Sequence, residues 1–417
     1  MTKNFTIAFV CLVAQMSTAQ LTANGSIAIK TNKILYDKVS DKMFATVPST
    51  NGSNGNSLAV ISPKTISVDK TVFAGSEPTV MAISDNSAFI YVGFRGTNSV
   101  RKYDVASQTF AAPFSMGTSV SYGPLYAGDI KVMPGSPNTI AVSKKQFNTS
   151  ASFKGVAIYD EGVMRPTTSF NPENFTYDSA DIIAFESPEY ILGISTGTSD
   201  SKLRRIKVTA NGATDINQNV TLTSYPGDFV IFEGKVIFDN GQVFDYKNST
   251  LLGTFSNVKG SFTIDYTNRI ITYANNYYSY NAGIKRFNID TFLPIDDFPI
   301  SQSEQILSVA NCGQGCIAYN TESKIYFLKD NALATSNINL QKTFVITPNP
   351  VKDVLSFVTD QNIKIKSAKV FEASGRVVIE KEVLDNKIDV RNLKAGTYFV
   401  SAVDNYGRIN QAKIIKN

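Results

Sequence analysis

Short apolar runs recur through residues 20–340, and each spans only four or five positions, as expected for β-strands. The clearest runs are Met43–Val47, Phe89–Gly93, Thr139–Val142, Tyr190–Gly193, Lys235–Phe238, Arg269–Thr272 and Cys316–Tyr319. They recur about every 34 to 50 residues, which is the interval of a four-stranded propeller blade. No helical period of useful length interrupts them. The pattern predicts an all-β fold with a seven-bladed β-propeller over residues 20–340.

A second strand follows each run, and several of these strands end in an aromatic residue and an acid. They are Leu58–Ile61, Val100–Asp104, Val156–Asp160, Lys202–Ile206, Val243–Asp245, Ile284–Asp290 and Lys324–Phe327. The shortest interval, between Ile237 and Ile271, predicts one blade with shortened loops. Closing the ring requires the two ends to meet. We therefore expect Ser26–Lys30 to complete the last blade beside Lys324–Leu328.

Residues 341–417 read as a separate module with a strict alternation of apolar and polar positions. The alternating stretches are Val354–Val358, Ile363–Lys366, Ala368–Phe371, Val377–Ile379 and Thr397–Val400. Short alternating strands joined by turns predict a small Ig-like β-sandwich.

Four ordered motifs in this module carry a resemblance. They are the opening Pro348, Asn349 and Pro350, the turn at Gly375-Arg376, the strand Leu393–Val400 with Gly396 and Tyr398, and the basic last strand with Lys413 and Lys416. Together they resemble the type A C-terminal sorting domain of the type IX secretion system of Bacteroidetes. The resemblance implies export by the type IX secretion machinery. It also implies removal of the domain by a sortase-like peptidase, which can attach the mature protein to surface lipopolysaccharide. An adhesive or carbohydrate-binding sandwich is the alternative.

The N-terminus is consistent with export. Lys3 precedes the apolar run Phe5–Ala14, and small residues at Ser17 and Ala19 suit cleavage before Gln20, which predicts a signal peptide over residues 1–19. No later run approaches the roughly 20 apolar residues of a transmembrane helix. The expected location is therefore secreted, or anchored at the outer-membrane surface.

Composition narrows the chemistry. The chain has no histidine, which excludes Ser-His-Asp triads, Cys-His pairs and histidine-built zinc sites, and we expect neither a metal nor a cofactor. Most of the net charge of +5 comes from residues 344–417, with 12 basic and 8 acidic side chains, so no nucleic-acid partner is expected. Cys312 and Cys316, separated by Gly-Gln-Gly, are predicted to form a disulfide in an oxidising compartment.

Acidic residues precede the predicted innermost strand of five blades: Glu77, Asp129, Asp181, Asp228 and Glu304. Polar and aromatic loops should share their rim: Ser49–Asn56, Gly93–Thr97, Lys144–Asn148 and Asn275–Asn281, the last with Tyr277 and Tyr278. Tyrosine and asparagine suit recognition of a glycan or a peptide. The alternative is that the acids hydrogen-bond nearby backbone and cap turns.

The repeat also resembles the broad superfamily of seven-bladed propellers that includes lactonase-like and surface-layer members. We expect a noncatalytic binding module with an extracellular glycan or protein ligand. The alternative is an extracellular hydrolase or lyase acting on a lactone or glycan, with Glu77, Asp129, Asp181 and Asp228 as its carboxylates and Arg95 as an electrostatic stabiliser. A purely structural surface-layer component is a third alternative.

Overall fold

The chain forms two compact units, Met1–Ala334 and Thr335–Asn417. The computed structural model describes residues 21–417 except 148–151, 172, 174–177, 198–200, 276–281, 301–303, 331–343, 360–363, 373–375 and 406–408. The predicted signal peptide, Tyr277 and Tyr278 lie outside the described residues. Strands dominate the described part of both units, and a short 3-10 helix η1 (Ser49–Asn54) joins β3 to β4.

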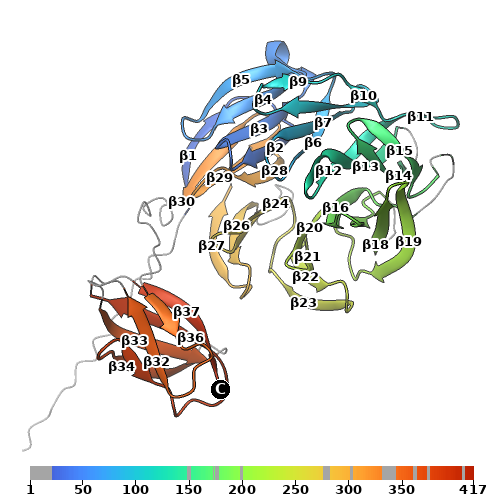
Figure 1. Cartoon of the computed structure of the whole chain (residues 1–417). Helices are drawn as coiled ribbons and strands as arrows, with labels where there is room; N and C mark the ends of the chain where they lie inside the picture. The colour runs from blue at the N-terminus through green and yellow to red at the C-terminus, as the bar shows by residue number, and fades with distance from the viewer. Residues whose placement is uncertain are drawn as a thin grey trace, which may run out of the picture. The chain divides into compact units, whose positions relative to one another are not determined.

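The first unit is a ring of small antiparallel sheets that follow one another in chain order (Figure 1). The first two sheets are β2 (Lys33–Asp37), β3 (Lys42–Val47), β4 (Ser57–Ser62) and β5 (Ser67–Phe73), then β6 (Pro78–Ile83), β7 (Phe89–Phe94) and β8 (Ser99–Asp104), with β9 (Thr109–Phe110) and β10 (Phe114–Ser115) on β8. The next two are β11 (Thr118–Ser119), β12 (Gly123–Met133), β13 (Ser136–Gln146), β14 (Phe153–Asp160) and β15 (Val163–Thr168), then β16 (Ile182–Ser187), β17 (Tyr190–Ile194), β18 (Lys202–Thr209) and β19 (Gly212–Thr221).

The remaining sheets of the ring include one with short strands and one that joins the two ends of the first unit. They are β20 (Phe229–Phe232), β21 (Lys235–Phe238), β22 (Gln242–Asp245) and β23 (Thr250–Thr254), then β24 (Phe262–Asp265), β25 (Ile270–Asn275), β26 (Gly283–Asn288) and β27 (Pro294–Pro299), and last β28 (Ile306–Asn311), β29 (Cys316–Thr321) and β30 (Ile325–Asp330) with β1 (Leu21–Ile27). The apolar runs found in the sequence fall on the second strand of their sheets, except Thr139–Val142, which lies on β13, the third strand after the short β11. The short strands β20–β23 match the shortest repeat interval.

Each sheet packs its apolar side chains against the next sheet. Phe44 on β3, Leu58 on β4 and Val92 on β7 share one cluster and are at most 2% exposed. Tyr273 and Phe287 from the sheet β24–β27 pack with Phe255, which follows β23. Full burial of one such side chain is worth about 1.5–3 kcal/mol, so the interfaces between sheets hold the ring together.

The ring closes through β1 and β30, which pair antiparallel with Leu21 opposite Asp330. The closing strand includes the expected Ser26, opposite Tyr326, and Ile27, opposite Ile325, but it begins at Leu21 and ends at Ile27. The chain turns there, with the Ile29 N–H donating to the Ile27 carbonyl, and leaves the sheet to enter β2.

A buried guanidinium secures this closure. Arg286 on β26 is 2% exposed and donates to Asp296 on β27 at 2.8 Å and to Asp330 at 2.5 Å. Asp296 also accepts the backbone N–H of Leu21 at 3.3 Å. These contacts tie the last two sheets of the ring to the first residue of β1.

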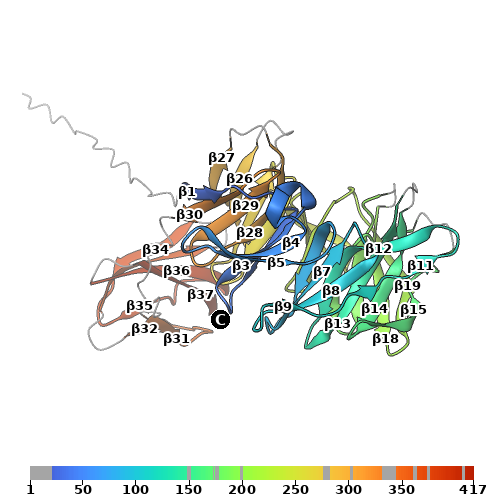
Figure 2. The same cartoon turned by 90° about the horizontal axis from the view of Figure 1, so that it is seen from above.

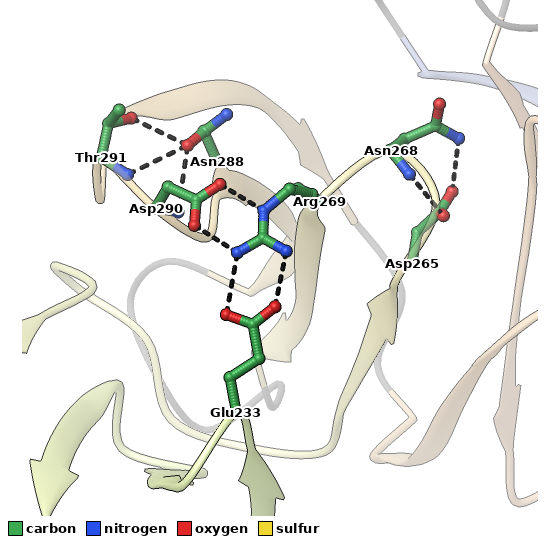
Figure 3. A network of polar contacts seen from close by, with 7 residues as sticks. All are labelled: Glu233, Asp265, Asn268, Arg269, Asn288, Asp290 and Thr291. Carbon is green, nitrogen blue, oxygen red and sulfur yellow. Dashed lines mark hydrogen bonds and ion pairs between the residues drawn. The ribbon is translucent and has the colours of Figure 1, made fainter. Parts of the chain in front are cut away.

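A second arginine links neighbouring sheets at the turns where the innermost strands end (Figure 3). Arg269, between β24 and β25, donates to both oxygens of Glu233 at 2.8 and 3.1 Å and to both oxygens of Asp290 at 2.5 Å. Asp265 caps the same turn by accepting from the backbone and side chain of Asn268. These two bidentate ion pairs of Arg269 hold the sheets β20–β23 and β24–β27 against each other.

The sheets β12–β15 and β16–β19 touch through one parallel bridge, Thr167 with Gly212. Gly212 has φ +125°, and a Cβ there would lie 2.1 Å from the Thr167 carbonyl oxygen, so only glycine fits. In Figure 2 the hairpin of β11 and β12 extends to the outside of the ring.

The second unit contains two sheets that enclose one core. One is β31 (Phe344–Thr347), β32 (Val354–Thr359) and β35 (Lys387–Asp389). The other is β34 (Val377–Glu382), β33 (Ile365–Glu372), β36 (Gly396–Asp404) and β37 (Ile409–Lys416). The end of the predicted strand Ile363–Lys366 and the predicted strand Ala368–Phe371 belong to one strand, β33, in which a register shift between Ile365 and Ser367 interrupts the alternation. Ile363 lies outside the described residues.

Candidate functional site

Asp129 lies within β12 and is 4% exposed. Its carboxylate accepts the backbone N–H of Ile183 on β16 at 3.0 Å, its neighbour's N–H at 2.9 Å, and the Lys131 ammonium at 2.7 and 2.8 Å. The first of these bonds crosses between the innermost strands of adjacent sheets. Asp129 therefore joins two sheets.

Asp181 immediately precedes β16 and is 1% exposed. One carboxylate oxygen accepts the Ser179 hydroxyl at 2.8 Å and the Thr196 N–H at 2.9 Å, and the other lies 2.8 Å from the Lys145 ammonium. This ion pair anchors β13 to the next sheet, as the Asp129 contact anchors β12.

Glu304 and Glu77 lie at turns. Glu304 accepts the hydroxyls of Thr321 and Ser323 at 2.6 and 2.7 Å, and these bonds lower its pKa. Glu77 has φ +54°, its N–H donates to the Asn56 side chain, and its carbonyl accepts the Arg95 N–H. Both residues stabilise the loops that lead toward innermost strands.

Asp228, directly before β20, differs from the other acids. Its side chain is exposed to solvent, whereas Asp129 and Asp181 are buried. Desolvation raises its pKa, with the charge of Asp129 adding to the rise and Lys33 and Lys131 opposing it. Asp239, 7% exposed, likewise has a raised pKa because of burial, and the charge of Asp228 adds to that rise. These groups share one electrostatic cluster.

A cavity lies elsewhere among the described residues, between the β7–β8 turn and the strands β12 and β13. We call it the cleft. Its volume is about 600 Å³, and it is lined by Arg95, Gly96, Thr97, Asn98, Tyr122, Pro124, Leu125, Tyr126, Gln146 and Phe147. Two loops that the sequence placed on one rim, Gly93–Thr97 and Lys144–Asn148, thus contribute to the same cavity.

Aromatic rings and a guanidinium form one wall of the cleft. Tyr126 and Phe147 stack with centroids 4.3 Å apart, and the Arg95 guanidinium carbon lies 5.5 Å from the Phe147 centroid. Both rings are half-buried and Arg95 is exposed. A flat ligand can therefore contact ring surface and a positive charge in one place.

Tyr122 forms another part of the lining and covers a buried cation. The Lys154 ammonium lies 3.6 Å from the centre of the Tyr122 ring, and Lys154 is 2% exposed. Burial lowers the pKa of Lys154, and the charge of Glu173 opposes that effect. The Gln146 side-chain amide donates to the Tyr122 carbonyl, which holds the turn between β11 and β12 that carries this ring.

Glu173 holds the β11–β12 hairpin in place. Its carboxylate accepts the N–H groups of Ser121 and Val120, both at 2.9 Å, and the Ser119 hydroxyl at 3.0 Å. The backbone N–H donors lower the pKa of Glu173 to about 2. The carboxylate is therefore ionised at neutral pH and keeps Tyr122 over Lys154.

Arg95 lies beside Glu77 through a backbone hydrogen bond, but it lines the cleft without the carboxylates considered with it. None of Glu77, Asp129, Asp181 and Asp228 is among the described lining residues of the cleft. Of the four, the structure brings only Asp129 and Asp228 close enough for a charge interaction that shifts a pKa. Within the described part of the chain, no cluster of three or more acidic or cysteine side chains could hold a metal ion.

Sequence reasoning missed Asn98, Tyr122, Tyr126 and Gln146 as a group. Gln146 is within a loop that the sequence places on the rim, but Tyr126 lies in a strand whose apolar alternation suggests ordinary packing, and Tyr122 lies in the turn before that strand. Because the two rings do not share one regular strand, their spacing of four residues does not predict that both line the cleft.

Cys312 and Cys316 form the expected disulfide, with Cα atoms 4.9 Å apart.

The sorting residues also meet. Asn349 contacts the backbone of Lys413 and Ile415, Val351 pairs with Lys416, and the Tyr398 hydroxyl donates to the Lys394 carbonyl. Gly396 begins β36 opposite Lys416.

Comparison with known proteins identifies the two units. Residues 345–417 match the secretion system C-terminal sorting domain. The crystal structure of the Cps50 (Swd1) β-propeller domain of Myceliophteria thermophila is similar to 74% of this chain and 99% of its own chain, with a TM-score of 0.56 and 10% identity. No curated protein matches the sequence.

These matches assign fold and destination. The ring of sheets is a β-propeller, and the tail is a type IX sorting domain that indicates a secreted or outer-membrane surface-attached protein. Among the described residues, no helix has the length and apolar character to cross a membrane.

Proposed function

We propose that this protein is a noncatalytic binding module that the type IX system delivers to the cell surface or medium, and that its ligand occupies the cleft. The observation that carries the proposal is a cavity of about 600 Å³ in which half-buried aromatic rings adjoin amide, hydroxyl and guanidinium groups. Binding sites combine apolar surface with a few placed polar groups in this way. A glycan fits this chemistry.

The same proposal includes the finer architecture. The strand orders support seven four-stranded blades, with β1 completing the last, and the two facing sheets of the tail support an Ig-like sandwich. The N-terminal pattern supports a signal peptide over residues 1–19, and the sorting motifs support processing by a sortase-like peptidase in a member of the Bacteroidetes.

The binding role is favoured over hydrolysis because of where the acids are. Asp129, Asp181 and Glu304 are engaged in bonds that join sheets or cap turns. A glycosidase requires two carboxyl groups flanking the bond that breaks, and the described lining of the cleft contains none.

A glycan array probed with the full-length protein tests the proposal. We expect saccharide binding that is lost in Tyr126→Ala, because the ring supplies contact area in the cleft. The control is Tyr266→Ala, an exposed ring in the turn that follows β24, which should bind like the unmodified protein. Equal binding by the Tyr126→Ala protein, or no saccharide binding, would contradict the proposal.

A further inference from the structure

The cleft has an uneven charge balance. Arg95 lines it, and its described lining residues include no aspartate or glutamate. Among the described residues, the side chain of Arg95 contacts the ring of Phe147 rather than a carboxylate. An exposed guanidinium held against a ring keeps its N–H donors available for an anionic group.

A second positive charge lies behind the lining. Lys154 is 2% exposed, and its ammonium rests on the face of Tyr122, whose ring lines the cleft. A cation taken out of water is screened less than a surface cation, so its field extends into the cavity. The negative charge of Glu173 acts on Lys154 and offsets part of this field.

A third basic side chain lies on the strand that carries Gln146. Lys144 is 3% exposed, with its ammonium 3.6 Å from the Met164 sulfur. Burial lowers its pKa to about 8, so it is largely protonated at neutral pH. Lys144 contacts Met164 on β15 and is not a lining residue, so Arg95 on the lining and Lys154 behind Tyr122 are positive charges beside a cavity whose described lining holds no acid.

We propose that the cleft binds an anionic saccharide, an inference that rests on the proposed function. Arg95 would contact the acidic group, and the rings of Tyr126 and Phe147 would contact the sugar. Guanidinium groups bind carboxylates and sulfates through paired, charge-assisted hydrogen bonds. Aromatic faces offer the flat apolar surface against which a sugar ring packs. The anion can be a uronic acid carboxylate or a sulfate ester, and the probes distinguish the two.

Calorimetric titration of the full-length protein with defined probes tests the inference. The probes are galacturonate oligomers, the same oligomers as methyl esters, and a sulfated galactan oligomer of equal length. We expect the acidic oligomers to bind about tenfold more tightly than the esters, the effect of one charge-assisted contact. That preference should shrink in 0.5 M salt, where screening is stronger.

Arg95→Gln should abolish the preference for acid over ester. The matched control, Lys64→Gln, removes an exposed charge in the turn between β4 and β5 and should leave it intact. Tighter binding of galacturonate than of the sulfated oligomer assigns the anion as carboxylate, and the reverse order assigns it as sulfate.

Equal affinity for acid and ester, or an unchanged preference in Arg95→Gln, would overturn the anionic ligand while leaving the binding function standing. Failure of both acidic probes to bind would overturn it as well. If the array then still shows saccharides that depend on Tyr126, the cleft binds neutral sugars, and only the anionic inference is lost.

Discussion

The side-chain amide of Asn349 bonds twice to the last strand of the chain, accepting the Ile415 N–H at 2.8 Å and donating to the Lys413 carbonyl at 3.0 Å. It pairs with β37 as another strand would. The Val351 N–H continues the ladder by donating to the Ile415 carbonyl at 2.7 Å. The opening motif of the sorting domain thus holds the terminal strand in place.

Replacing Asn349 with alanine should loosen β37. Two hydrogen bonds are lost, and we expect a loss of roughly 1 to 2 kcal/mol in the local opening free energy. Hydrogen exchange of residues 409–417 in the full-length protein measures this, and the amount of exported protein should fall with it. Asn392→Ala, at an exposed position of the same domain, serves as the control. Unchanged exchange in Asn349→Ala would show that the amide does not secure the strand.

Arg269→Gln should weaken the junction of the sheets β20–β23 and β24–β27. The side chains of Arg269, Glu233 and Asp290 are 38%, 54% and 47% exposed, so water reduces the cost to about 1 kcal/mol. Thermal unfolding in low salt should show a small drop in melting temperature that disappears in 1 M salt. Arg269→Lys should recover only part of the loss, because an ammonium cannot form two forks. A salt-independent loss would indicate a packing role instead.

Asp228→Asn should stabilise the propeller at neutral pH. Desolvation raises the pKa of Asp228 in the folded state, so ionisation costs stability as the pH rises from the ordinary carboxyl value of 3.8 through the raised value. Because Asp228 is exposed, water screens part of that cost. Removing the charge should therefore raise the melting temperature at pH 7 by at most about 2 °C and have little effect below pH 4. Asp69→Asn, which breaks an exposed ion pair with Lys42, should show no such rise. An equal effect at both pH values would contradict the raised pKa.

Reduction of the Cys312–Cys316 disulfide should cost about 2 kcal/mol, because the bond closes a loop of only five residues. Thermal unfolding with and without a reductant measures the difference. The double variant Cys312→Ala/Cys316→Ala should be insensitive to the reductant. A loss several times larger would mean that the bond supports more than its own hairpin.

The sequence predicted the repeated strands well because each buried strand requires a local run of apolar residues, as in Met43–Val47 and Phe89–Gly93. It predicted only the end of the closing strand, Ser26 and Ile27, since Leu21 at its start is held by partners more than 270 positions away, such as Asp296. The β-bulge between Ile365 and Ser367 also hid the continuity of β33. Local alternation cannot report such long-range pairing or register shifts.

The candidate site was harder to predict. The loops around Arg95 and Gln146 were placed on one rim because a repeated topology sends equivalent loops to the same end. The acids before the innermost strands predict a shared binding rim, yet Asp129 and Asp181 face neighbouring sheets and are almost fully buried. Whether a carboxylate faces solvent or a backbone N–H depends on the neighbouring sheet, which a local pattern does not contain.

Hydrogen exchange with and without a saturating saccharide identified on the array locates the ligand and tests the central claim most directly. The account predicts slower exchange in residues 93–98 and 122–126, on two sides of the cleft, and no change in residues 227–230 beside Asp228 or in the β24–β25 turn. Protection confined to residues 227–230 would place the ligand at the centre of the ring and contradict the assignment of the cleft as the binding site.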